Sequence, residues 1–212
     1  MCTSQRVIRM IPLAMLPMLL WCADLRAQDR LPPVSPDKMT AEQKKAAADF
    51  MAVRNTAPTG PFSVMLRVPE LMDLTFKWRL HLTTKPTIDT RLIELGILIT
   101  ARHWTQQYEW NAHYPLALKA GLKADTIAAI AEGRRPAQMP EDEAIIYDLL
   151  TELLHNQRVS DPTYARALAK FGEPGIVEAT SLAGYYAMLA MVMNTARTPL
   201  PAGATPGLTA FP

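Results

Sequence analysis

Residues 91–121 read RLIELGILITARHWTQQYEWNAHYPLALKAG, and this stretch decides the fold class. Its first half repeats apolar side chains at the spacing of one helix face, namely Leu92, Leu95, Leu98 and Ile99, which predicts a helix over 91–104. A second helix is predicted over 106–120, because Gly121 is the residue type that most often follows a helix end. Two adjacent helices are therefore expected at the centre of the chain.

Helical patterns continue on both sides of this stretch, and no segment alternates in the manner of a strand. Helices are predicted over 41–55, 70–82, 124–132, 141–157, 161–171 and from 174 to about 194. Thr40 and Gln43 have the spacing of a capping box at the first of these, and TAPTGPF at 56–62 predicts a break. The last helix is apolar almost all round and should be buried. We therefore predict an all-α bundle of about seven or eight helices.

The N-terminus has the pattern of a secretory signal. Arg6 and Arg9 precede an apolar run at 10–23 that is too short to span a bilayer, and Ala27 is suitable as the last residue before cleavage. A lipid anchor on Cys22 is the second interpretation. We expect a periplasmic or secreted protein without stable membrane insertion after cleavage. The predicted organisation is a signal peptide at 1–27, a lead-in and first helix at 28–60, a helical domain at 61–196 and an irregular arm at 197–212.

Removing the signal changes the charge and the cysteine content. The chain has 22 Lys and Arg against 20 Asp and Glu, and residues 1–27 contain three of the former and one of the latter, which leaves 19 of each. A near-neutral domain gives no indication of nucleic-acid binding. Both cysteines, Cys2 and Cys22, lie in the signal. The exported domain would therefore have no thiol chemistry.

The second predicted helix carries a possible acid–base group. Gln106, Glu109 and His113 are spaced three and four residues apart, so they project from one helix face. A carboxylate beside an imidazole orients the ring and favours its protonated form. On the preceding helix, Glu94 interrupts an apolar stripe and needs a partner. The structural alternative pairs Glu94 with Arg91 or Arg102 and makes His113 part of the core.

The motifs from Arg91 to Gly121 resemble the carboxymuconolactone decarboxylase and alkylhydroperoxidase D-like superfamily. The resemblance is carried by Arg91, Glu94-Leu95, Ala101-Arg102, Tyr108-Glu109-Trp110, His113 and Ala120-Gly121-Leu122. Elsewhere it extends only to the order of helices. It implies the helical fold of that superfamily, and it implies assembly as a homotrimer or homohexamer with pockets between subunits.

The resemblance also implies roles for individual residues. In the peroxidase branch, a glutamate and a histidine relay protons to two cysteines, and Glu94 and His113 occupy the places of the relay groups. Gln106 and Glu109 stand where the cysteines would be. A family label of peroxiredoxin would therefore describe the chemistry of relatives, since this chain has no thiolate there.

The expected function is decarboxylase-like acid–base chemistry, without a cofactor, on a small lactone or unsaturated carboxylic acid. His113, oriented by Glu109, is the candidate acid, and Glu94 is a second acid–base group. The candidate substrate-binding residues are Arg102, Arg91, Gln106, Tyr108 and His81.

Two alternatives come from other functional classes. One is a divalent metal bound by Glu94, Glu109 and His113 together with His103 or His81, although the resemblance implies no metal. The other is an oligomeric ligand-binding protein without catalysis.

Overall fold

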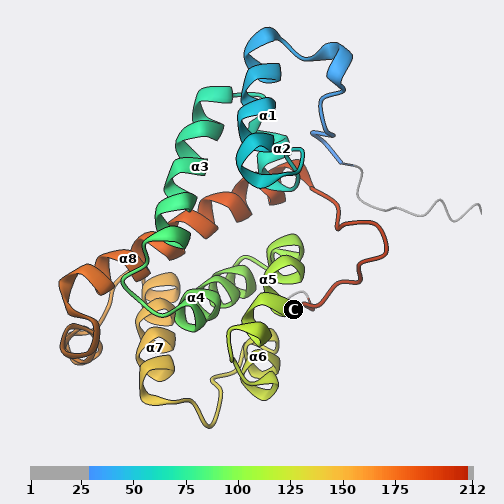
Figure 1. The fold of residues 1–212 in the computed structure, drawn as a ribbon. Coiled ribbons are helices and arrows are strands. Elements are labelled where there is room, and N and C mark those ends of the chain that lie inside the picture. The colour runs from blue at the N-terminus through green and yellow to red at the C-terminus, as the bar shows by residue number, and fades with distance from the viewer. Residues whose placement is uncertain (1–28, 210–212) are drawn as a thin grey trace, which may run out of the picture.

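The computed structural model describes residues 29–209, which form an all-helical bundle in which no strand occurs (Figure 1). The all-α prediction is confirmed. A short 3-10 helix, η1 (Pro36–Lys38), precedes α1 (Ala41–Arg54), α2 (Pro61–Met65), α3 (Pro69–Thr84), α4 (Thr90–His103), α5 (Gln107–Lys119), α6 (Ala124–Ala131), α7 (Glu141–Asn156) and α8 (Asp161–Ala196). The signal predicted over 1–27, with Cys2 and Cys22, lies outside the described residues.

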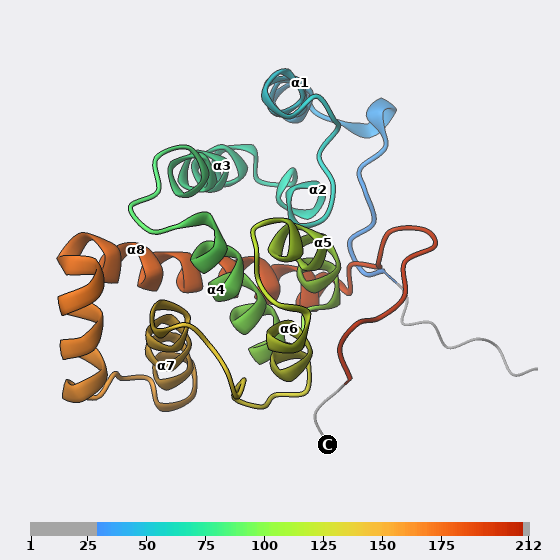
Figure 2. The same cartoon turned by 60° about the horizontal axis from the view of Figure 1, so that its bottom comes forward.

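Helix α4 is the centre of the bundle. It packs against α5, α7 and α8, and these helices surround it in both views (Figures 1 and 2). All residues from Leu92 to Arg102 are buried, and Leu95 and Leu98 have no exposed surface. Full burial of each such aliphatic side chain contributes roughly 1.5–3 kcal/mol, so α4 provides the apolar contacts that fix its neighbours in place.

Helix α8 is buried as its apolar sequence predicts. Tyr185, Leu189 and Met193 are almost completely shielded from solvent. As predicted, one helix ends and another begins at Gly172, whose non-helical φ of 66° makes a kink, and both lie within the element α8. Helix α8 is long and apolar enough to cross a membrane, but 56% of its most apolar window is buried inside the bundle. That burial is what a core helix shows.

Helix α2 was not predicted, because TAPTGPF reads as a break. Gly60, with φ of 56°, turns the chain, and all five residues of α2 are then buried. A five-residue helix is too short to show a period, so only tertiary burial stabilises it. At the other end of the same region, the capping box of Thr40 and Gln43 forms as predicted.

Residues 197–209, the described part of the C-terminal arm, are irregular and pack on the rest of the chain. The Gln107 side chain donates a hydrogen bond to the Leu208 carbonyl (2.5 Å), and the Gly207 and Leu208 amides donate back to it (3.1 Å each). Leu208 is buried, and a Cβ on Gly207 would lie 2.6 Å from the Trp110 ring. The arm therefore covers one side of α5.

Candidate functional site

The structure brings together Glu94, Glu109 and His113, which we call the Glu–His cluster. Glu94 comes from α4, and the other two come from the neighbouring α5. His113 Nδ1 lies 2.8 Å from Glu94 Oε2, and His113 Nε2 lies 3.7 Å from Glu109 Oε2. The three residues are only 4–8% exposed. The imidazole thus lies between two buried carboxyl groups.

The two carboxyl groups have different roles from those expected. We expected Glu109 to orient His113, but the hydrogen bond is made by Glu94 from the facing helix. A carboxylate only accepts, so this bond places the proton of a neutral ring on Nδ1 and leaves the lone pair of Nε2 toward Glu109. Glu94 is therefore the orienting group, and Arg91 pairs with Asp142 and Glu143 instead.

Burial changes the ionisation of Glu109. It raises the pKa of this carboxyl group to about 7, and the nearby charges of His113 and Arg79 oppose that rise only in part. Its Oε1 atom is buried and has no hydrogen-bond partner among the described residues. Near neutral pH, Glu109 is therefore present both with and without its proton. A group of this kind is suited to proton transfer.

Two tyrosines of α8 pack next to the cluster. The Tyr186 ring meets the His113 ring edge to face at 5.2 Å, and the Tyr185 ring meets Tyr186 at 5.1 Å. Burial raises the pKa of both phenols above its ordinary value of 10. Both hydroxyl groups therefore stay neutral and are hydrogen-bond donors at physiological pH.

Gln106 and Tyr108 have structural contacts at the start of α5. The Gln106 Oε1 atom accepts from the Tyr108 amide at 2.6 Å, and its Nε2 atom donates to Asn194 of α8 at 2.8 Å. The Tyr108 ring lies over Gly60, where a Cβ would be 2.5 Å away. These contacts cap α5 and fix it to α8 and α2.

Arg91 forms ion pairs with α7. Its guanidinium donates to Asp142 at 2.6 Å and to Glu143, whose side chain is buried. These pairs tie the first turn of α4 to the acidic first turn of α7. The structure therefore gives Arg91 a contact between helices instead of a place at the Glu–His cluster.

Replacing Arg91 with lysine is expected to lower the free energy of unfolding by about 1 kcal/mol, because a single ammonium cannot bind both carboxylates in the same way. Chemical denaturation measures this loss. Arg135→Lys is the control, since the Arg135–Asp148 pair is more exposed and should matter less. Unchanged stability together with a raised KM would instead assign Arg91 to substrate binding.

The remaining sequence candidates lie on other parts of the bundle. Arg102 is buried and donates to the Thr209 carbonyl of the arm at 2.7 Å, and burial lowers its pKa. His81 is exposed on α3. His103 meets His155 of α7 edge to face at 4.9 Å, beside a small cavity that Arg102 also lines. The structure thus separates His103 from the role of a ligand beside His113.

The geometry does not favour a metal at the Glu–His cluster. Within residues 29–209, no group of three or more His, Cys, Asp or Glu side chains is arranged to hold a metal ion. The reason is visible in His113, whose two ring nitrogens face two different carboxyl groups. Ligands of one ion would instead have to converge on a common point.

Arg79 of α3 was missed by the sequence analysis. It is half-buried, and its charge acts on Glu109, Tyr185 and Tyr186. In the sequence it lies among alternating basic and apolar residues, in FKWRLHL. Nothing in that pattern distinguishes it from a solvated surface arginine, because the packing of α3 on α8 is what brings it to the site.

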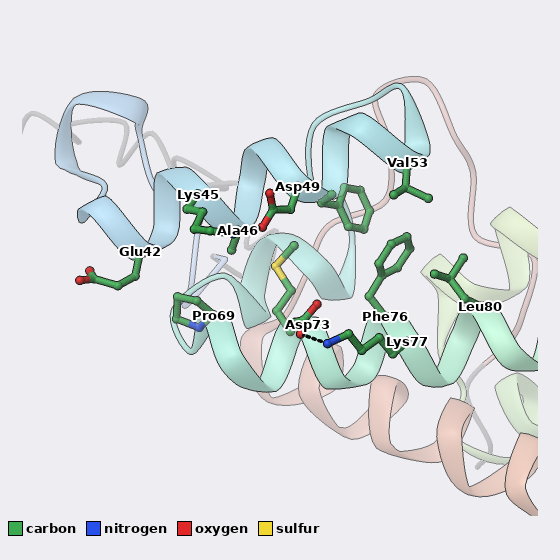
Figure 3. A pocket seen from close by; sticks show the side chains of 12 residues that line it. Glu42, Lys45, Ala46, Asp49, Val53, Pro69, Asp73, Phe76, Lys77 and Leu80 are labelled. Carbon is green, nitrogen blue, oxygen red and sulfur yellow. Dashed lines mark hydrogen bonds and ion pairs between the residues drawn. The ribbon is translucent and has the colours of Figure 1, made fainter.

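The largest of the five main cavities among the described residues lies between α1 and α3 (Figure 3). It measures about 580 Å³, and its lining includes the apolar side chains of Phe50, Met72 and Phe76 as well as the Lys77–Asp73 pair. None of these five cavities is lined by a member of the Glu–His cluster. The cluster therefore lies apart from these five cavities.

The chemistry that this site could perform is inferred from its geometry. It combines a histidine held at one nitrogen, a carboxyl group that titrates near neutrality, and two neutral tyrosines. Comparison with protein-family models and with curated proteins finds no match for the chain.

Proposed function

We propose that this protein is an acid–base enzyme of the carboxymuconolactone decarboxylase-like group, acting on a small lactone or unsaturated carboxylic acid. The observation that carries the proposal is the buried Glu–His cluster. In it, Glu94 fixes His113 at 2.8 Å, and the pKa of Glu109 is raised to about 7. Acid–base sites typically contain neighbouring titratable groups whose different environments shift their pKa values apart.

The proposed reaction needs only proton transfer from the protein. A carboxylate on the saturated carbon next to an unsaturated system loses carbon dioxide as the electrons of the breaking carbon–carbon bond enter that system. The carbon left behind then takes up one proton, so the reaction consumes a proton and releases carbon dioxide. His113 is the proposed donor to carbon, and Glu109 is the proposed group that returns the proton to Nε2.

A thiol peroxidase mechanism is not proposed. Both cysteines of the chain lie at positions 2 and 22, and Gln106 and Glu109 occupy the positions where a thiol pair would lie in the peroxidase branch. Without a thiolate, no group of the helical domain can attack a peroxide in that way.

An exported homotrimer or homohexamer is part of the proposal. Helix α3 supports it with an exposed apolar stripe, since Leu71, Leu74 and Trp78 are 47%, 58% and 39% exposed at helical spacing. Such a stripe is suited to a subunit contact. Sedimentation of the mature protein should therefore give a mass several times that of one chain.

A ligand-binding oligomer without turnover is the second candidate. The observation that favours it is the burial of the Glu–His cluster, whose members line none of the five main cavities among the described residues. Ligand binding without product formation would identify this function.

The test is a screen of the mature protein on small lactones and unsaturated carboxylic acids. Loss of ultraviolet absorbance reports consumption of the conjugated substrate, and carbon dioxide release reports decarboxylation. We expect both signals together for at least one acid, and no consumption of peroxide with an added thiol donor. Peroxide turnover, or binding of the acids without product, would reject the proposal.

A further inference from the structure

A groove between α5 and α6 differs from the other main cavities in the chemistry of its lining. It measures about 520 Å³, and none of its lining residues is an Asp, Glu, Lys, Arg or His. Each of the other four main cavities among the described residues has at least one such residue in its lining. The lining comes from α5, from α6 and from the arm, namely Trp110, Asn111, Tyr114, Pro115, Ala124, Ile127, Ala128, Ala131 and Gly207.

Aromatic side chains form the α5 wall of this groove. Trp110 and Tyr114 lie four residues apart, so they project from the same face of the helix. Trp110 is 4% exposed and Tyr114 is 41% exposed, so the first ring is fixed in the core and the second is accessible from solvent. Asn111 adds a side-chain amide, which can both donate and accept a hydrogen bond.

The α6 wall is apolar and consists mostly of small residues. Ala124, Ala128 and Ala131 are spaced four and three residues apart on one helix face, and Ile127 beside them is fully buried. Because an alanine side chain ends at Cβ, this wall leaves room that a larger residue would fill. An aromatic wall together with a wall of methyl groups is suited to a flat apolar molecule.

The C-terminal arm bounds the groove at Gly207, and Figures 1 and 2 show the end of the arm near α5 and α6. A Cβ on Gly207 would lie 2.6 Å from the Trp110 ring, so the arm backbone rests directly against the indole. The Gln107 side chain holds this part of the arm by three hydrogen bonds to Gly207 and Leu208. The groove is therefore bounded by three segments of one chain, and such concave sites favour a small molecule over the surface of a second protein.

We propose that the α5–α6 groove binds a small uncharged aromatic compound, with its ring against Trp110 and Tyr114 and a hydrogen bond to Asn111. The volume of the groove lies within the roughly 300–1,000 Å³ of small-molecule sites. A charged ligand would lose hydration there without meeting a side chain of opposite charge in the lining. No member of the Glu–His cluster lines the groove, so this site is separate from the proposed site of the carboxylic acid.

The test is calorimetric titration of the full chain with benzamide and with benzoate, which share a ring and differ in charge. We expect a Kd for benzamide below about 1 mM. Ala128→Leu fills the groove from an exposed position of α6 and should weaken this binding at least about tenfold. Tyr114→Ala should weaken it about two- to tenfold, because one aromatic contact is lost. Ala52→Leu is the control, since Ala52 is exposed on α1 and lines none of the five main cavities.

The affinities of benzamide and benzoate are compared for the binding that Ala128→Leu removes, since a carboxylic acid is also the proposed ligand of the Glu–His cluster. In that comparison, benzamide should bind at least about tenfold more tightly. Equal affinities, no binding of benzamide up to about 10 mM, or unchanged affinity in Ala128→Leu would overturn the site. A lower sedimentation mass of Ala128→Leu would instead assign the groove to a contact between copies of this chain. Circular dichroism of each variant shows whether the fold is retained.

Discussion

Replacing His113 with glutamine is expected to lower kcat about 10²- to 10⁴-fold on any substrate that the screen identifies, because this removes the imidazole that lies between the two carboxyl groups. Glutamine is of similar length and keeps a donor for Glu94, so the fold should be retained. Steady-state rates, measured together with circular dichroism, test this expectation. His113→Ala should lose activity to the same extent, but it should also lose stability, since Glu94 would be left buried without its partner.

The matched control is His155→Ala. His155 is exposed at the end of α7 and bonds only to the Thr151 carbonyl at 3.0 Å, so its removal should leave the rate within about twofold of the wild type. Retained turnover in His113→Gln would show that the imidazole has a structural role. Loss of turnover in both histidine variants would point instead to a general effect on the fold.

Glu94→Gln separates orientation from proton transfer. The amide oxygen still accepts from Nδ1, but it no longer provides a charge to stabilise the imidazolium that forms when His113 takes up a proton. We therefore expect a smaller fall in kcat than for His113→Gln and a change in the pH profile. An unchanged profile would remove Glu94 from the proton path.

Much of the helical frame follows from local sequence patterns. Thr40 with Gln43 fixes the start of α1, and the apolar period of 91–104 fixes α4, because caps and periods act over a few residues. The proximity of Glu109 and His113 follows in the same way, since they lie four residues apart on one helix. These are predictions that involve one element at a time.

The contacts between elements were not predictable in this way. Glu94 was expected to need a partner, but its hydrogen bond to His113 depends on how α4 packs against α5. Arg79 and Tyr185 come from helices far apart in the sequence, and only the packing of α3 on α8 places them beside the cluster. A motif restricted to thirty residues contains no information on such contacts, because the charges around the site depend on how distant helices pack.

Replacing Glu109 with glutamine is expected to make the protein more stable at alkaline pH while it abolishes activity. The folded state raises the pKa of Glu109 from its ordinary value of 4.5 to about 7, and burial is the main cause. A raised carboxyl pKa means that the folded protein binds this proton more tightly than the unfolded chain does. Its contribution to stability is therefore fully present below about pH 4.5 and is lost as the pH rises through 7.

The size of this loss follows from the difference between the two pKa values, and it corresponds to roughly 3 kcal/mol above pH 8. Glutamine has the same shape and no charge to bury, so Glu109→Gln should equal the wild type near pH 4 and exceed it at pH 8. For a chain of this length, that difference is a rise in Tm of about 5–10 °C. Thermal melts from pH 4 to pH 9 measure it, with the exposed Glu70→Gln as a control without effect.

A gain in stability at the cost of activity would separate a functional carboxyl group from a structural one. If the charged carboxylate stabilised the fold, replacing it with a neutral side chain would destabilise the protein. A carboxyl group kept for proton transfer is instead buried where its charged form is unfavourable, so it destabilises the folded state once it ionises. Lower stability of Glu109→Gln at pH 8 would therefore show that Glu109 is a structural ion-pair partner of His113. Equal stability at every pH would show that its carboxyl group titrates as it does in the unfolded chain, and the group that returns the proton to His113 would then have to be another one.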